Sequence, residues 1–143
     1  MANAAHILSS KHAGVVSVSP QATVLEAAQV MNEHHIGSLV VTEDERLVGI
    51  FTERDVMRRV VAAQRDAATT KIADVMTKQV ACASRHTTSD ELRNVMREQR
   101  IRHVPVVEGT VVVGMISIGD LNRAEQAVQE ETIRYLEQDM SVP

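Results

Sequence analysis

An internal repeat constrains the fold of this chain more than any other feature of its sequence. Residues 49–55 read Gly-Ile-Phe-Thr-Glu-Arg-Asp, and residues 114–120, sixty-five positions later, read Gly-Met-Ile-Ser-Ile-Gly-Asp. In both copies a strand-like apolar run comes before the glycine, and a helix-like pattern follows. The hydroxyl residue and the aspartate three positions on have the spacing of a helix N-terminal cap, so Thr52 with Asp55 and Ser117 with Asp120 are predicted to start helices. Such a helix start can also bind an anion.

The same offset relates residues 15–55 to residues 80–120 throughout. It pairs Thr23 with Thr88 and Glu26 with Glu91, which gives each copy a second capping pattern. Each copy reads as strand, helix, strand, strand, helix. Two such units cannot each cover both faces of a small sheet, so they should pack together about a pseudo-twofold axis, with a cleft between them. The sequence therefore predicts an α/β fold of two tandem β-α-β-β-α repeats.

The repeat pattern also suggests where the segments begin and end. We expect an N-terminal helix and lead-in (1–14), a first repeat (15–65), a connector with a lead-in helix (66–79), a second repeat (80–123) and a C-terminal helix (124–143). The last helical pattern is predicted to start at Asp120 and to continue beyond its repeat to Leu136. With Met57, Val60 and Val61 it offers more apolar helix surface than one small unit covers, which predicts a homodimer through these helices.

Composition argues against several classes of protein. The formal net charge is -4, and Phe51 and Tyr135 are the only aromatic residues, so a nucleic-acid partner is not expected. The single cysteine, Cys82, cannot form an internal disulfide, which favours the cytoplasm. No apolar run approaches the length needed to span a bilayer, so we expect a soluble protein without a membrane partner.

Catalytic and metal-binding patterns are also weak. The sequence has no nucleophile elbow, no glycine-rich phosphate loop ending in lysine and no recognisable acid-base pair, so we do not expect an enzyme. His34 and His35 are adjacent and cannot face the same way on one helix. The other histidines, at positions 6, 12, 86 and 103, lack the spacing of metal ligands. Cys82 falls in a predicted strand and is expected to be a small buried residue and not a reactive thiol.

Four runs carry a resemblance to a known family: the doubled junction, residues 36–41 (Ile-Gly-Ser-Leu-Val-Val), residues 101–106 (Ile-Arg-His-Val-Pro-Val) and residues 72–77 (Ile-Ala-Asp-Val-Met-Thr). Over residues 7–140 the chain resembles the pair of cystathionine-β-synthase (CBS) domains called a Bateman module. The resemblance implies a sensor of adenosine ligands that dimerises through its helices. The lead-in at residues 7–11 aligns with the second one only after a small shift, and it lacks the usual acid.

The junctions offer chemistry that suits such a ligand. One carboxylate can accept hydrogen bonds from both ribose hydroxyls, a role that we expect for Asp55 and Asp120. Thr52 and Ser117 add a hydroxyl beside free amides at a helix start, which favours phosphate oxygens. The alternative is that all four residues are only caps.

The repeats differ at positions that a ligand would contact. Gly37 and Ser38 of the first repeat stand where the second has Arg102 and His103, and Arg54 stands opposite a glycine. The resemblance implies that such basic residues lie over phosphates, and hence that one nucleotide site dominates. Alternatives are surface ion pairs for the arginines and a packed, uncharged histidine.

In that dominant site, Asp120, Ser117 and Arg102 are expected to hold the adenosine-phosphate end of the ligand. Lys11 is expected to be solvated, with contact to base or phosphate as the alternative. The adenine is expected to lie against strand backbone and apolar walls, although aliphatic residues of this kind also simply form cores. The residues concerned are Val16 and Val18, Val80 and Cys82, and Ile36, Ile101 and Pro105.

We therefore expect a non-catalytic sensor of AMP, ADP, ATP or NAD(H) that signals to an effector protein which the sequence does not identify. S-adenosylmethionine ranks last because it lacks phosphate and leaves the basic residues unexplained. A dimerisation scaffold with no physiological ligand is the alternative, and a metal or redox sensor using Cys82 and the histidines is a weaker one.

Overall fold

The fold was analysed in a computed structural model, which describes residues 2–11 and 14–141, with side chains up to residue 138. The first repeat contains β1 (Ser17–Val18), α2 (Val24–His34), β2 (Ser38–Glu43), β3 (Arg46–Thr52), α3 (Glu53–Asp55) and the π-helix η1 (Val56–Val61). The second contains α5 (Ser89–Gln99), β4 (His103–Glu108), β5 (Val111–Ser117) and α6 (Ile118–Ser141). Two further helices, α1 (Ala4–Lys11) and α4 (Ile72–Val75), precede the repeats in the chain.

The strands form one five-stranded sheet in the order β1-β2-β3-β5-β4. Each repeat contributes an antiparallel hairpin, β2-β3 or β4-β5. The hairpins meet where Arg46 pairs with Val111 and the Leu47 amide donates to the Thr110 carbonyl at 3.0 Å. The predicted mixed α/β fold of two repeats is confirmed, and the two hairpins, in the order β2-β3-β5-β4, are symmetric about the β3-β5 contact.

The predicted strand at residues 80–82 is wrong. In the first repeat β1 pairs in parallel with β2, but in the second only Ala83 bridges to Val106. Ala83 donates to the Pro105 carbonyl at 2.9 Å and accepts from Val107 at 2.9 Å. A further pair of this parallel ladder would need the backbone N–H of residue 105 as a hydrogen-bond donor. Residue 105 is a proline, which has no N–H. Val40 occupies the equivalent position in the first repeat, where the ladder forms.

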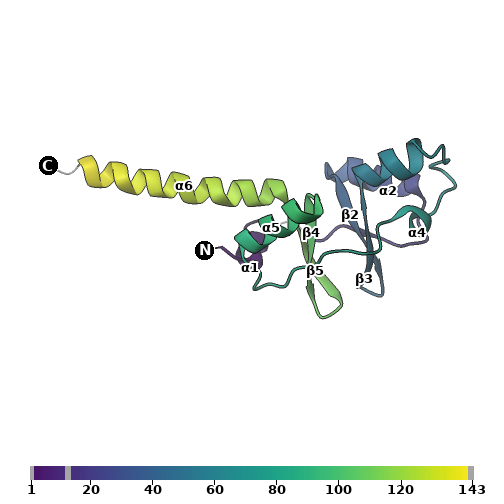
Figure 1. The fold of residues 1–143 in the computed structure, drawn as a ribbon, viewed down its shortest axis with the longest axis horizontal. Coiled ribbons are helices and arrows are strands. Elements are labelled where there is room, and N and C mark those ends of the chain that lie inside the picture. Colours follow the sequence, from purple (N-terminus) through teal and green to yellow (C-terminus); the bar gives the residue numbers. More distant parts are fainter. Residues whose placement is uncertain (1, 12–13, 142–143) are drawn as a thin grey trace.

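The two lead-in helices cross between the repeats. Ile72 and Val75 of α4 are buried in the core of the first repeat, with Phe51 and Leu39. Ala4 and Ile7 of α1 are buried in the core of the second repeat. Figure 1 shows α4 beside β3 and α2, and α1 beside β5 and α5. Each repeat thus completes its core with the helix that precedes the other repeat in the chain.

Helix α6 begins two residues earlier than the predicted start at Asp120, because Ser117 is the residue that caps it. It extends well away from the sheet and the other helices (Figure 1). Large apolar side chains are exposed along its described part, namely Val128, Ile133, Tyr135 and Leu136. Among the described residues, no helix is both long and apolar enough to cross a membrane.

Candidate functional site

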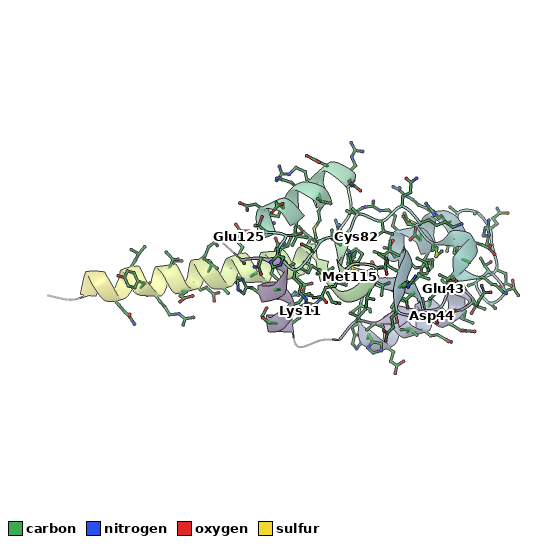
Figure 2. All side chains as sticks on the ribbon, turned by 90° about the horizontal axis from the view of Figure 1, so that it is seen from below. Lys11, Glu43, Asp44, Cys82, Met115 and Glu125 are labelled. Atoms are coloured by element: carbon green, nitrogen blue, oxygen red, sulfur yellow. The ribbon has the colours of Figure 1, made fainter. Side chains whose placement is uncertain are left out.

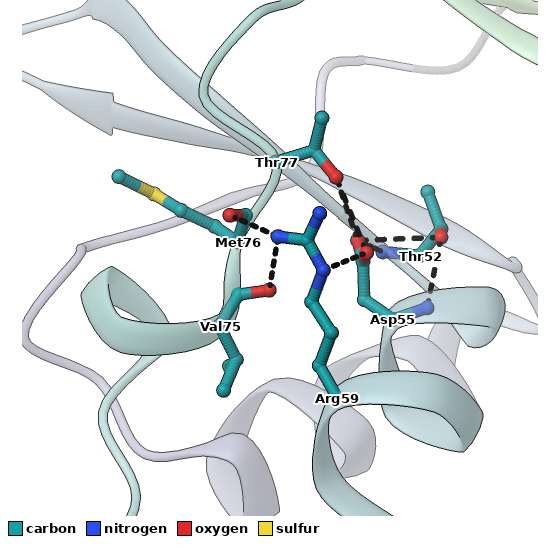
Figure 3. A network of polar contacts seen from close by, with 6 residues as sticks. All are labelled: Thr52, Asp55, Arg59, Val75, Met76 and Thr77. Carbon is teal, nitrogen blue, oxygen red and sulfur yellow. Dashed lines mark hydrogen bonds and ion pairs between the residues drawn. The ribbon is translucent and has the colours of Figure 1, made fainter. Parts of the chain in front are cut away.

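The first junction is a complete capping box. Thr52 accepts from the Asp55 amide at 3.3 Å, and the Asp55 carboxylate accepts from the Thr52 amide at 3.0 Å. The other carboxylate oxygen accepts from the Thr77 hydroxyl at 3.2 Å and lies 3.6 Å from Arg59 Nε. Figure 3 shows these groups converging on a carboxylate that is only 6% exposed. The predicted cap is confirmed, and Thr52 at the end of β3, Thr77 after α4 and Arg59 on η1 together fix the position of the carboxylate.

The second junction is built in the same way but carries more positive charge. The Asp120 carboxylate accepts from the Ser117 amide at 2.8 Å, and the Ser117 hydroxyl accepts from the Asp120 amide at 3.1 Å. Lys11 Nζ lies 2.9 Å from one carboxylate oxygen, and Arg123 pairs with the other. Burial on its own raises the pKa of Asp120, but the Ser117 amide and Lys11 outweigh it, and the net pKa is lowered. Asp120 is therefore a buried, ionised carboxylate.

Lys11 does not take the solvated position expected for it. Besides Asp120, its ammonium donates to the Met115 carbonyl at 2.7 Å, and Figure 2 shows Lys11 lying near Met115. The position follows from the crossing of α1, which brings its last residue to the end of β5 in the other repeat. Thr77 is the corresponding group at the first junction, so a neutral hydroxyl there takes the place of a cation here.

Two cavities lie between the repeats, one beside each junction. The first cavity, of about 350 Å³, lies beside Asp55, and the second, of about 410 Å³, beside Asp120. Both fall within the size range of small-molecule sites, which starts at roughly 300 Å³. The predicted site residues that line the first cavity are Thr52, Arg54, Asp55, Val80, Ile101, Arg102, His103 and Gly37. Those that line the second cavity are Ser117, Asp120, Lys11, Val16, Ile36, Gly37, Ser38 and His103.

The structure does not group these residues as the sequence analysis does. Arg102 lines the first cavity with Asp55 and does not line the second with Asp120 and Ser117. The pseudo-twofold arrangement places the turn before β4 over the junction of the first repeat, and Arg54 Nη1 donates across to the Arg100 carbonyl at 2.8 Å. Each cavity is thus made by the junction of one repeat and the strand entry of the other.

Three expected wall residues line neither cavity. Val18 packs on the core of the first repeat, and Pro105 is buried in β4. Cys82 is exposed and not buried as expected, because the strand predicted around it does not form. Desolvation of its sulfur raises the pKa of the Cys82 thiol, which disfavours the reactive thiolate.

The structure adds residues that the motifs do not single out. Thr77, Gln79, Arg58 and Arg59 line the first cavity. His34, His35 and Arg123 line the second. The repeat offset could have identified Arg58 and Arg123, since they are equivalent positions sixty-five residues apart. Arg59 follows only from the folded geometry.

His103 lines both cavities. Burial lowers its pKa below the ordinary value of 6.5, and the nearby charges of Glu53 and Asp120 oppose this only in part. The imidazole is therefore mainly uncharged at neutral pH, which supports the packed alternative over a charged phosphate donor.

No group of three histidine, cysteine or acidic side chains suited to a metal ion occurs among the residues whose structure is described. His12, one of the histidines considered in the sequence, lies outside those residues.

Comparison with known proteins identifies the repeat. The family model described as the CBS domain matches twice, at residues 6–62 and 72–127. The CBS domain-containing protein CBSX3, mitochondrial, of Arabidopsis thaliana is 36% identical over 119 residues, which are 80% of this chain and 58% of that protein. The chain thus spans less than two thirds of the length of that relative. The solved structure of the CBS-domain containing protein ATU1752 from Agrobacterium tumefaciens has a TM-score of 0.81 and 37% identity, covering 87% of this chain and 99% of that one.

Two solved neighbours carry bound groups. The CBS domain pair of protein MJ0100, with 25% identity and a TM-score of 0.79 over 89% of this chain and 98% of that one, is in complex with 5-methylthioadenosine and S-adenosyl-L-methionine. Hypoxic Response Protein I, with 33% identity and a TM-score of 0.74 over 87% of this chain and 99% of that one, has two coordinated zinc ions.

Proposed function

The chain belongs to the CBS domain family, as a pair of repeats, and we propose that it is a regulatory module that binds an adenine nucleotide between the repeats and has no catalytic activity of its own. One observation carries this proposal. Each of two cavities of ligand size has, at its edge, a capped helix start with a buried aspartate, 6% and 4% exposed respectively.

Ribose and phosphate suit these groups. A ribose diol has two hydroxyl donors that a carboxylate such as Asp55 or Asp120 can accept together. The first cavity also contains Arg54, Arg58 and Arg102, whose guanidinium groups match phosphate oxygens in charge and geometry. The first cavity is therefore the dominant nucleotide site in this proposal, with AMP, ADP, ATP or NAD(H) as its ligand.

The neighbour in complex with S-adenosyl-L-methionine and 5-methylthioadenosine shows that a CBS pair can bind adenosine compounds without phosphate. Four arginines line the first cavity against two carboxylates, a net charge of +2, and a phosphate-free ligand would leave this charge unneutralised. Phosphate-bearing ligands therefore rank first for this chain.

Ligand binding between the repeats would be signalled to other proteins through the exposed helices. Met57 and Val61 of η1 and the apolar side chains of α6, including Tyr135, are exposed. We propose that a second copy of the chain covers them, and that ligand binding changes how this homodimer presents itself to an effector protein. A single free cysteine fits a reducing compartment such as the cytoplasm.

A thermal-shift screen of the purified protein against AMP, ADP, ATP, NAD, NADH and S-adenosylmethionine tests the proposal. A ligand at 100 times its dissociation constant adds about 2.7 kcal/mol to the free energy of unfolding. For a domain of this size that is roughly 5–10 °C in Tm. The protein is first freed of copurified nucleotide, as judged by its absorbance at 260 nm. If none of the six compounds raises Tm, the nucleotide proposal is refuted.

One observation favours the alternative of a dimerisation scaffold without a ligand. Both aspartates are already satisfied within the chain, Asp55 by Thr52, Thr77 and Arg59, and Asp120 by Ser117, Lys11 and Arg123. A nucleotide would have to share or displace these partners. The zinc-bound neighbour keeps a metal sensor as the weaker alternative, and elemental analysis of the purified protein tests it.

A further inference from the structure

The two cavities are equivalent by symmetry but not in charge. Three arginines line the first cavity at positions where the symmetry-related residue is small and uncharged: Arg54, Arg59 and Arg102 correspond to Gly119, Ala124 and Gly37. The volumes differ little, at about 350 and 410 Å³. Charge, more than size, must therefore decide what each cavity can hold.

The first cavity contains arginine side chains that are not neutralised by an acidic partner in the part of the chain that the structure describes. Arg58 and Arg102 are exposed, and among the described residues neither guanidinium group makes a hydrogen bond or ion pair. The Arg54 side chain donates one hydrogen bond there, to the Arg100 carbonyl. Arg58 and Arg59 are consecutive yet both line the cavity, and they lie on the π-helix η1, where successive side chains diverge less than on an α-helix. In the second repeat the equivalent residues lie on a regular α-helix.

In the second cavity, as far as the structure describes the chain, both cations are already paired with a carboxylate, and two cations against one carboxylate give a net charge of +1. Its lysine and its arginine, Lys11 and Arg123, both pair with the Asp120 carboxylate. Its histidines are His34, His35 and His103, and burial holds the pKa of His103 below its ordinary value. A chain of phosphates placed here would have to break the pairs that neutralise a buried carboxylate, which is costly.

We propose that the two cavities bind different classes of adenosine compound in the same chain. The first takes a nucleoside di- or triphosphate, whose charge Arg54, Arg58 and Arg102 neutralise. The second takes an adenosine compound with at most one phosphate. The chain would then hold two different ligands at once. This inference rests on the proposed nucleotide-binding function and specifies the ligand of each site.

Isothermal titration of the full chain with ATP and AMP, at pH 8.0 without divalent cations, tests the division. ATP alone is expected to bind at one equivalent per chain. AMP titrated into the ATP-saturated protein is then expected to bind at one further equivalent, in the second cavity. If saturating ATP abolishes AMP binding, or if ATP itself binds at two equivalents of equal affinity, the division is refuted.

Arg58→Gln assigns the ATP to the first cavity. The Arg58 side chain is exposed and contacts no hydrogen-bond or ion-pair partner in the described part of the chain, so folding should be unaffected. The variant should weaken ATP binding about tenfold, because a charge-assisted hydrogen bond is lost, and should change AMP binding at the second equivalent less than about threefold. Arg97→Gln on α5 is the matched control, since it removes the same charge from an exposed position that lines neither cavity.

Nucleotide binding and the division between the two cavities can be refuted separately. If neither ATP nor AMP binds, the nucleotide-binding function itself is refuted. If both bind, but Arg58→Gln and Arg102→Gln weaken ATP no more than Arg97→Gln does, the nucleotide-binding function stands and the division between the cavities is wrong.

Discussion

Substitution of Asp120 by alanine separates a ligand-binding module from an empty scaffold. The variant removes the acceptor for the Ser117 amide, a capping interaction worth about 1 kcal/mol. It also leaves Lys11, whose side chain is only 26% exposed, with the Met115 carbonyl but without its carboxylate partner, at a cost of about 1–2 kcal/mol. The pair with Arg123 adds little, because that side chain is 70% exposed. We expect a total loss of about 2–3 kcal/mol, or roughly 4–10 °C in Tm.

Ligand affinity should fall as well. A ribose hydroxyl that donates to a carboxylate contributes about 1.5–3 kcal/mol, so AMP should bind Asp120→Ala roughly 10- to 100-fold more weakly. Glu91→Ala is the matched control, since Glu91 closes the equivalent capping box of α5 with Thr88, at 3.2 Å, and lines neither cavity. It should cost about 1 kcal/mol and leave AMP binding unchanged.

Both properties can be measured on the same samples, stability by urea denaturation followed by circular dichroism and affinity by calorimetry. If Asp120→Ala lowers stability while AMP affinity stays at the wild-type value, the ribose contact proposed for Asp120 is refuted and its carboxylate is a cap only. If AMP binds neither the wild type nor the variant, the scaffold alternative holds. Asp120→Asn, which keeps an acceptor oxygen but loses the charge, shows whether charge or hydrogen bonding matters to the ligand.

Three further predictions concern pH, packing and assembly. Because the pKa of His103 is lowered in the folded state, the unfolded state binds more protons below about pH 6.5, so the free energy of unfolding should fall between pH 8 and pH 5.5, and less steeply in His103→Gln. Gly49→Ala should cost about 1–3 kcal/mol because its β-carbon would lie 3.0 Å from a backbone oxygen, whereas Gly14→Ala, with nothing within 4 Å, should cost much less in the same denaturation series. If α6 forms the dimer contact, the double variant of Val128→Glu and Tyr135→Glu should give a monomer mass by light scattering; a dimer mass would place the contact elsewhere.

The sequence predicts well those features that depend on neighbouring residues. The capping pairs at Thr52 and Thr88 form as expected because both partners lie within four residues of each other. The two consecutive strands expected in each copy also form, each pair as a hairpin, since apolar runs rich in β-branched residues and a short turn specify them locally. The repeat offset then gives the symmetric strand order.

What the sequence does not predict is which distant groups meet. The grouping of Arg102 with Asp120 is not what the structure shows, because the pseudo-twofold axis places the entry of β4 over the opposite junction. Lys11 meets Asp120 only because α1 crosses to the second repeat. The missing strand near Cys82 depends on the absent amide of Pro105, twenty-three positions away, which no local pattern reveals.

Because each lead-in helix packs on the other repeat, we can predict which helix the first repeat needs in order to fold: the one that follows it in the chain and not the one that precedes it. Two fragments of equal length contain the whole of β2, β3 and α2: residues 1–65, with the helix that precedes the first repeat, and residues 15–79, with the helix that follows it. Only the second contains Ile72 and Val75, which are 0% and 1% exposed in the core of the first repeat.

We expect fragment 15–79 to show a cooperative urea transition and fragment 1–65 to lack one. Removing even one buried isoleucine costs about 2–5 kcal/mol, a large part of the stability of a domain of this size. The introduction of Ile72→Ala into fragment 15–79 is the internal control and should abolish its transition. If fragment 1–65 were the more stable of the two, α1 would pack on its own repeat. Lys11 could then not reach Asp120, and the second cavity would lose one of its two cations.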